Sequence, residues 1–105
     1  MPQIKHVVLL KIRRDVTPEL LAEVMAELGE LRRVIPGILD FSWGANNSQE
    51  GLHQGFTHGF VMTFADLAAV SAYMPHPEHE RVKGRIVPLL EGGLAGALIV
   101  DWEVA

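Results

Sequence analysis

The sequence predicts an α+β domain in which helices pack on one face of an antiparallel sheet. Four segments carry apolar residues at alternating positions, which is typical of strands, and the segments between them repeat apolar residues at helical spacing. Their order along the 105 residues is β-α-β-β-α-(α)-β. This length is typical of one domain, so we expect a single domain over residues 1–105.

The first strand and the first helix have clear boundaries in the sequence. Residues 4–13 alternate, and their centre is apolar on both faces, as expected of a strand that is covered on both sides. Thr17 is a favoured helix cap, and Pro18 suits the first helical position. The apolar stripe that follows continues to Ile35, after which Pro36-Gly37 ends the helix.

Two further strands flank a polar loop. Residues 38–44 alternate and predict the second strand, and residues 56–64 predict the third, with an apolar face that also carries a histidine. The intervening segment, ANNSQEGLHQG, is rich in turn-forming residues and long enough to cover a site.

The C-terminal half predicts a broken pair of helices and a closing strand. Asp66 can cap a helix over residues 67–74, which Pro75 ends. A third helix is expected over residues 77–90, and residues 98–104 predict the last strand. This order is the split β-α-β, ferredoxin-like arrangement with a four-stranded antiparallel sheet. We expect a second copy of the chain to cover the open face, closing a dimeric α/β barrel.

Composition narrows the classes of function. The net charge of −4 argues against nucleic-acid binding, and the absence of cysteine excludes disulfides and thiolate chemistry. No apolar run approaches the roughly 20 residues that span a bilayer. The N-terminus lacks the pattern of a signal peptide, so we expect a cytoplasmic protein. A hydrophobic content of 49% is high for so short a chain and indicates a homo-oligomer or a ligand cavity.

The segment YMPHPEHERV, residues 73–82, concentrates side chains that can move protons. Pro77 at the first helical position makes His76 the N-cap and His79 the third helical residue. The positive end of the helix and burial both disfavour imidazolium, so His79 should stay neutral and act as a base near pH 7. The break at Pro75 can turn Tyr73 toward the same space, where its phenol would donate a hydrogen bond to a carbonyl.

Two other interpretations of this segment stay open. His76 and His79 have the spacing of metal ligands, although no complete metal motif surrounds them. The Pro-His-Pro sequence can also form only a rigid bend, with His79 satisfying a local hydrogen bond. His6 and His58 favour the catalytic interpretation, because each lies on an otherwise apolar strand face. Together with Tyr73 and His79 they predict the walls of one largely apolar cavity with a few polar groups.

The chain resembles the stress-responsive dimeric α/β-barrel (Dabb) family. The resemblance covers essentially the whole sequence and is carried by KHVVLLKI, the IPG after the first helix, GFTHGFVMTF and AYMPHPEHERV. The Y-x-x-H-P-x-H element is its most specific part. The family implies a ferredoxin-like protomer and a homodimer.

The resemblance extends to the olivetolic acid cyclase-like branch, which closes a poly-β-keto chain by aldol condensation. It implies a catalytic base at His79, its partner at Tyr73, and substrate-binding positions at His6, His58 and His76. The family also implies a cation, Mg or Ca, held by the backbone carbonyls of three residues: Arg32, Ile35 and Ile38. No other cofactor and no metal held by side chains is expected.

The sequence thus supports two functions of different kinds. One is cofactor-independent acid-base chemistry, as a cyclase, isomerase or lyase, on an apolar carbonyl metabolite related to polyketides. The other is a non-catalytic role in stress or in binding a small ligand. A cofactor-free monooxygenase is a more distant analogy that rests on architecture alone.

Overall fold

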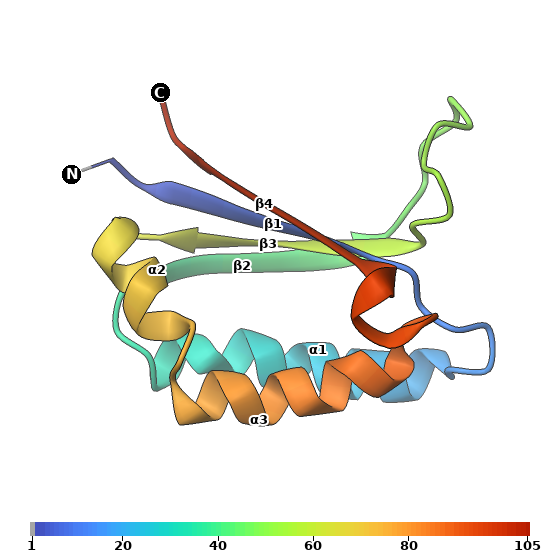
Figure 1. Ribbon diagram of the computed structural model, residues 1–105, viewed down its shortest axis with the longest axis horizontal. Helices are drawn as coiled ribbons and strands as arrows, with labels where there is room; N and C mark the ends of the chain where they lie inside the picture. The colour runs from blue at the N-terminus through green and yellow to red at the C-terminus, as the bar shows by residue number, and fades with distance from the viewer. Residues whose placement is uncertain (1) are drawn as a thin grey trace.

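The computed structural model describes residues 2–105 and has the predicted ferredoxin-like α+β fold. Four strands form one antiparallel sheet in the order β2-β3-β1-β4, so the N-terminal strand lies in the middle and the C-terminal strand at an edge. Figure 1 shows the helices on one side of this sheet and nothing covering the other side. The strands are β1 (Ile4–Leu10), β2 (Ile38–Ala45), β3 (His58–Phe64) and β4 (Ala97–Glu103).

The helices begin where the sequence places them. Thr17 accepts a hydrogen bond from the Leu20 amide at the start of α1 (Pro18–Glu30), and Asp66 accepts one from the Ala69 amide at the start of α2 (Leu67–Tyr73). These caps satisfy amides that have no partner within the helix. α3 (Pro77–Ile86) begins with a proline at its first position. Among the described residues, no helix is both long and apolar enough to cross a membrane.

Two predicted strands are longer than those observed. β1 was expected to reach Arg13 but ends at Leu10, because the Lys11 amide bonds to the Gly96 carbonyl outside the strand ladder. β3 was expected to begin at Phe56, whose amide instead closes a turn onto the His53 carbonyl. Neither departure changes which face of the sheet a residue occupies, because the period of two is kept.

Both long helices end earlier than their apolar stripes suggest. α1 passes into a 3-10 turn, Leu31–Arg33, so the buried Ile35 belongs to the following segment. α3 passes into the 3-10 turn Val87–Leu89, because Pro88 has no amide hydrogen to continue the α-helical ladder. A third 3-10 turn, Gly93–Gly96, leads into β4. The apolar residues still reach the core, but by way of these tighter turns.

The core lies between the sheet and the helices. Its fully buried side chains come from both layers: Leu10, Val24, Met25, Leu28, Leu31, Ile35, Met62, Phe64 and Val82. α1 and α3 lie beside each other (Figure 1) and are joined at their surface, where the Glu27 carboxylate receives the guanidinium groups of Arg81 and Arg85. This packing fixes the surface of α3 that faces the sheet, and that surface forms one wall of a cavity.

Candidate functional site

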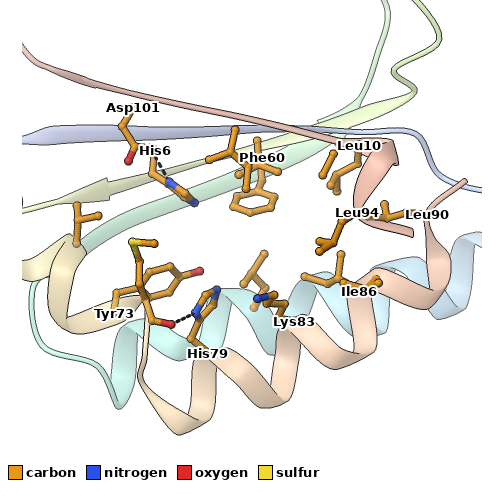
Figure 2. Close-up of a pocket in the computed structure, with 17 residues that line it drawn as sticks. His6, Leu10, Phe60, Tyr73, His79, Lys83, Ile86, Leu90, Leu94 and Asp101 are labelled. Atoms are coloured by element: carbon orange, nitrogen blue, oxygen red, sulfur yellow. Dashed lines mark hydrogen bonds and ion pairs between the residues drawn. The ribbon is translucent and has the colours of Figure 1, made fainter. Parts of the chain in front are cut away.

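A cavity of about 220 Å³ lies between the sheet and the two C-terminal helices. Its walls come from β1, β3 and β4 on the sheet side and from α2, α3 and the segments that follow on the other. Most of the lining is aliphatic or aromatic. The polar residues that line it are His6, Tyr73, His79, Lys83 and Asp101. In Figure 2, His6, Tyr73, His79 and Asp101 surround the end of the cavity next to α2. Lys83 lies further along α3.

The proline-rich break between α2 and α3 brings Tyr73 and His79 together. α2 ends at Tyr73, and the chain turns before α3 begins at Pro77, so residues six apart in sequence face the same space. The centres of the two rings are 4.0 Å apart, and the ring planes are inclined by 31°. This stacking leaves the edges of both rings turned toward the cavity (Figure 2).

The hydrogen bond of His79 determines which of its nitrogens is free. Nδ1 lies 2.9 Å from the carbonyl oxygen of Met74, and a carbonyl can only accept, so Nδ1 donates the proton. In the neutral ring, Nε2 therefore keeps its lone pair. Burial lowers the pKa of His79; the Met74 carbonyl and the Glu80 charge oppose this, while the charges of Lys83 and His6 add to it. The net result is a histidine suited to accept a proton.

Tyr73 is held as a neutral phenol. The residue is only 2% exposed, and burial raises the pKa of its hydroxyl well above the ordinary value. Its ring packs at 5.0 Å between centres against Phe64, which fixes its position. Among residues 2–105 we find no hydrogen-bond partner for the Tyr73 hydroxyl, so this donor is available to a ligand.

A third titratable group, His6, enters the cavity from the sheet. Its Nδ1 lies 2.6 Å from Oδ1 of Asp101 on the neighbouring strand β4. Because a carboxylate accepts, Nδ1 carries the proton and Nε2 is directed toward the cavity. The ring meets Tyr73 edge-on with centres 6.0 Å apart. His6, Tyr73 and His79 therefore border one space, as Figure 2 shows.

Asp101 and Lys83 were not recognised in the sequence. Asp101 directly faces His6 across the β1–β4 ladder, and the parity of β4 directs it to the helix side of the sheet. Lys83 lies four residues after His79 on α3, a spacing that places both side chains on one helix face. In principle, Asp101 could have been predicted from the strand register and Lys83 from the helical spacing.

The two remaining predicted residues, His58 and His76, do not line this cavity. His58 lies on the predicted face of the sheet. However, it is the first residue of β3, paired with Ala45, and it borders two other, more open pockets at that end of the molecule. Its Nδ1 is 2.8 Å from the Thr57 hydroxyl. His76 caps α3 with its own ring, whose Nδ1 accepts a hydrogen bond from the Glu78 amide. In the protomer, the cavity is therefore bordered by His6, Tyr73 and His79, while His58 and His76 lie outside its lining.

The predicted backbone cation site falls at the turn that ends α1. Its donors would be three neutral carbonyls, those of Arg32, Ile35 and Ile38, which suit Mg or Ca. At this turn the Glu30 carboxylate is paired with the Arg33 guanidinium. Within residues 2–105 no cluster of three acidic or histidine side chains has the geometry of a metal site. Cation binding therefore stays a prediction from the resemblance.

Comparison with known proteins identifies the family to which the chain belongs. The model of the Stress responsive A/B Barrel Domain family matches residues 4–104, so the chain belongs to this family. It is 34% identical to the stress-response A/B barrel domain-containing protein HS1 of Arabidopsis thaliana, over 95% of this chain and 88% of that protein. It is 29% identical to olivetolic acid cyclase of Cannabis sativa, over 72% of this chain and 75% of the enzyme.

A solved structure has the same fold over nearly the whole chain. It is a dimeric ferredoxin-like protein of unknown function from Jannaschia sp. CCS1, which superposes with a TM-score of 0.87. The two sequences are 35% identical, and the match covers 97% of this chain and 99% of that one. The likeness of the protomers confirms the predicted fold class.

Proposed function

We propose that the chain is a cofactor-independent acid-base catalyst that acts on an apolar carbonyl compound. The observation that carries the proposal is the contact between Tyr73, an available phenol donor, and His79, whose Nε2 is free to accept a proton. The similarity to olivetolic acid cyclase, an enzyme by its name, agrees with a catalytic role.

In the proposed reaction His79 removes a proton from the carbon next to a carbonyl. The C–H bond breaks, its electron pair becomes an enolate, and the proton moves to Nε2 to give an imidazolium. Tyr73 donates its hydroxyl hydrogen to the oxygen on which the negative charge develops, which lowers the barrier to enolate formation. The enolate carbon then attacks a second carbonyl of the same molecule, and the alkoxide that forms takes the proton back from the imidazolium. In an unsaturated substrate, the imidazolium instead returns the proton to the remote carbon of the dienolate, so cyclisation and isomerisation share the first step.

We also propose that the working form is a homodimer. The uncovered face of the sheet carries a continuous set of apolar side chains from three strands: Val7, Leu9, Val61, Leu98, Val100 and Trp102. Leu98, Val100 and Trp102 are 45%, 48% and 52% exposed. Exposed apolar patches of this kind on a small domain mark contact surfaces, and the similar protein from Jannaschia is described as dimeric.

The test uses a neutral 1,5-diketone with an alkyl tail, such as undecane-2,6-dione, in D₂O. Enolate formation incorporates deuterium beside the carbonyls, and ring closure with loss of water gives an enone that absorbs in the ultraviolet. We expect wild type to accelerate deuterium incorporation, and His79→Ala to lower that rate about 100-fold or more. Tyr73→Phe should lower it about 10- to 100-fold through loss of the oxyanion donor.

His53→Ala is the matched control, because His53 lies in the exposed loop and does not line the cavity. It should keep the wild-type rate. Full turnover by folded His79→Ala or Tyr73→Phe would contradict the catalytic proposal. Binding of the diketone by wild type with no acceleration would support the non-catalytic, ligand-binding role instead.

A further inference from the structure

The cavity holds one lining charge that the proposed reaction does not use. Of its charged residues, Asp101 is paired with His6 at 2.6 Å, which leaves the ammonium group of Lys83. Figure 2 shows the Lys83 nitrogen beside His79, on the side of α3 that faces the sheet. A positive group at this point is not needed to hold the fold, since the Lys83 side chain makes no hydrogen bond to another residue within 2–105.

The one acidic partner of Lys83 is a weak competitor for a ligand. Glu80 Oε2 lies 3.8 Å from the Lys83 ammonium, one helical turn earlier, and the two side chains are 44% and 51% exposed. Exposed pairs at this spacing contribute little, because both groups remain hydrated. An anion in the cavity would meet Lys83 from the side that lines it. The positive charge already reaches His79, where it is one of the causes that lower the pKa of that ring.

The rest of the cavity is divided into a polar and an apolar part. The polar groups lie next to the junction of α2 and α3, whereas Leu10, Leu90 and Leu94 surround the other end (Figure 2). Lys83 lies within α3, whereas Leu90 follows the 3-10 turn at the end of that helix. A ligand that satisfies both parts has a polar head and an alkyl or aryl tail.

We infer that the cavity takes a free carboxylic acid, with its carboxylate on Lys83 and its tail among the leucines. For the identity of the reacting carbonyl, this inference rests on the proposed function. A 3-oxo acid suits all three groups, because one carbon separates its carboxylate from its ketone. The carboxylate would contact Lys83 and the ketone oxygen Tyr73, and the carbon between them would present its proton to His79.

Binding of two isosteric probes, octanoate and octanamide, tests the carboxylate separately from any reaction. They share one tail and differ in charge. In calorimetric titration, we expect wild type to bind octanoate more tightly than octanamide, and the affinity for octanoate to weaken as salt is added. Amide shifts in a ¹H–¹⁵N NMR titration should fall at Tyr73, His79 and Leu94. Lys83→Met keeps the length and apolar stem of the side chain but removes its charge. It should weaken octanoate binding about five- to tenfold and leave octanamide unchanged.

Arg33→Met is the control for net charge, because Arg33 is highly exposed on the turn after α1 and lies outside the cavity. It should bind octanoate like wild type. Equal binding of octanoate by Lys83→Met and wild type would overturn the inference, as would an equal loss in Arg33→Met or equal affinity of wild type for the two probes. These outcomes are independent of turnover of the neutral diketone, so failure of the inference and failure of the proposed reaction are distinguishable.

Discussion

At the scale of single residues, the two cavity histidines differ in the oxygen that each one faces. His79 donates to an uncharged backbone carbonyl, that of Met74, whereas His6 donates to the carboxylate of Asp101. A carbonyl fixes the tautomer without adding a negative charge that would favour imidazolium. His79 can therefore be a neutral base. His6 has its Nδ1 proton held by the Asp101 carboxylate, so its Nε2 is left to contact a polar substrate group.

The pH dependence of His79 follows from its burial. Burial lowers its pKa from the ordinary histidine value of 6.5, so a falling pH protonates it later than an ordinary histidine. Turnover of the diketone should fall in acid with a midpoint below pH 6.5, because the protonated ring cannot accept a second proton. The ¹H NMR titration of the His79 ring should have its midpoint below 6.5. A midpoint above 6.5 would contradict the assignment of His79 as a buried base.

The lowered pKa of His79 also determines how this residue makes folding stability depend on pH. Between the lowered pKa of the folded state and 6.5, the unfolded chain binds more protons at this site than the folded one. His79 therefore contributes stability above pH 6.5 that is lost as the pH falls through the folded-state pKa. Replacing His79 by alanine should remove this part of the acid dependence in urea unfolding.

At the scale of elements, the position of Tyr73 depends on a glycine in another part of the chain. Gly37, in the turn between α1 and β2, has a φ of +92°, and a Cβ placed on it would lie 2.5 Å from the Ala69 side chain on α2. Ala69 and Tyr73 are four residues apart on that helix and so share a face. The turn at Gly37 and the helix that carries Tyr73 are thereby packed against each other.

We expect Gly37→Ala to lower the free energy of unfolding by about 1–3 kcal/mol, from backbone strain together with the clash. The Tyr73 resonances should shift as α2 moves. Gly84→Ala is the matched control, since Gly84 lies within α3 with no atom near the added methyl. That change should raise stability by about 0.5–1 kcal/mol. Urea unfolding at one protein concentration measures both, and equal stability of Gly37→Ala and wild type would contradict this packing.

The elements and the starts of the helices were predictable because they have local chemical signals, whereas several strand and helix ends were predicted too far along the chain. The caps Thr17 and Asp66 and the proline at position 77 start their helices as expected. The site was only partly predictable, because it depends on how far along a strand a residue lies. His58 and Phe60 share a face, yet only Phe60 lines the cavity. Recognising Asp101 required the pairing of β1 with β4, which joins residues 95 apart in sequence.

At the scale of the whole molecule, the sheet divides the chain into a closed and an open side. The helix side holds the core and the cavity, while the other side exposes the apolar residues of β1, β3 and β4. Val100 lies in the middle of the edge strand β4, directly opposite Val7 on β1. Covering the face with a second copy would explain the apolar content of the chain without any change in the protomer.

The dimer is tested by a charge on the open face. Val100→Lys places an ammonium where the partner sheet would pack, and a buried unpaired charge is strongly unfavourable. The variant should elute as a monomer in size-exclusion chromatography with light scattering, under conditions where wild type is a dimer. Leu67→Lys is the control: Leu67 is 60% exposed but lies at the start of α2, on the helix side. This variant should remain dimeric. A monomeric wild type, or a Val100→Lys variant that stays dimeric, would exclude the open face as the interface.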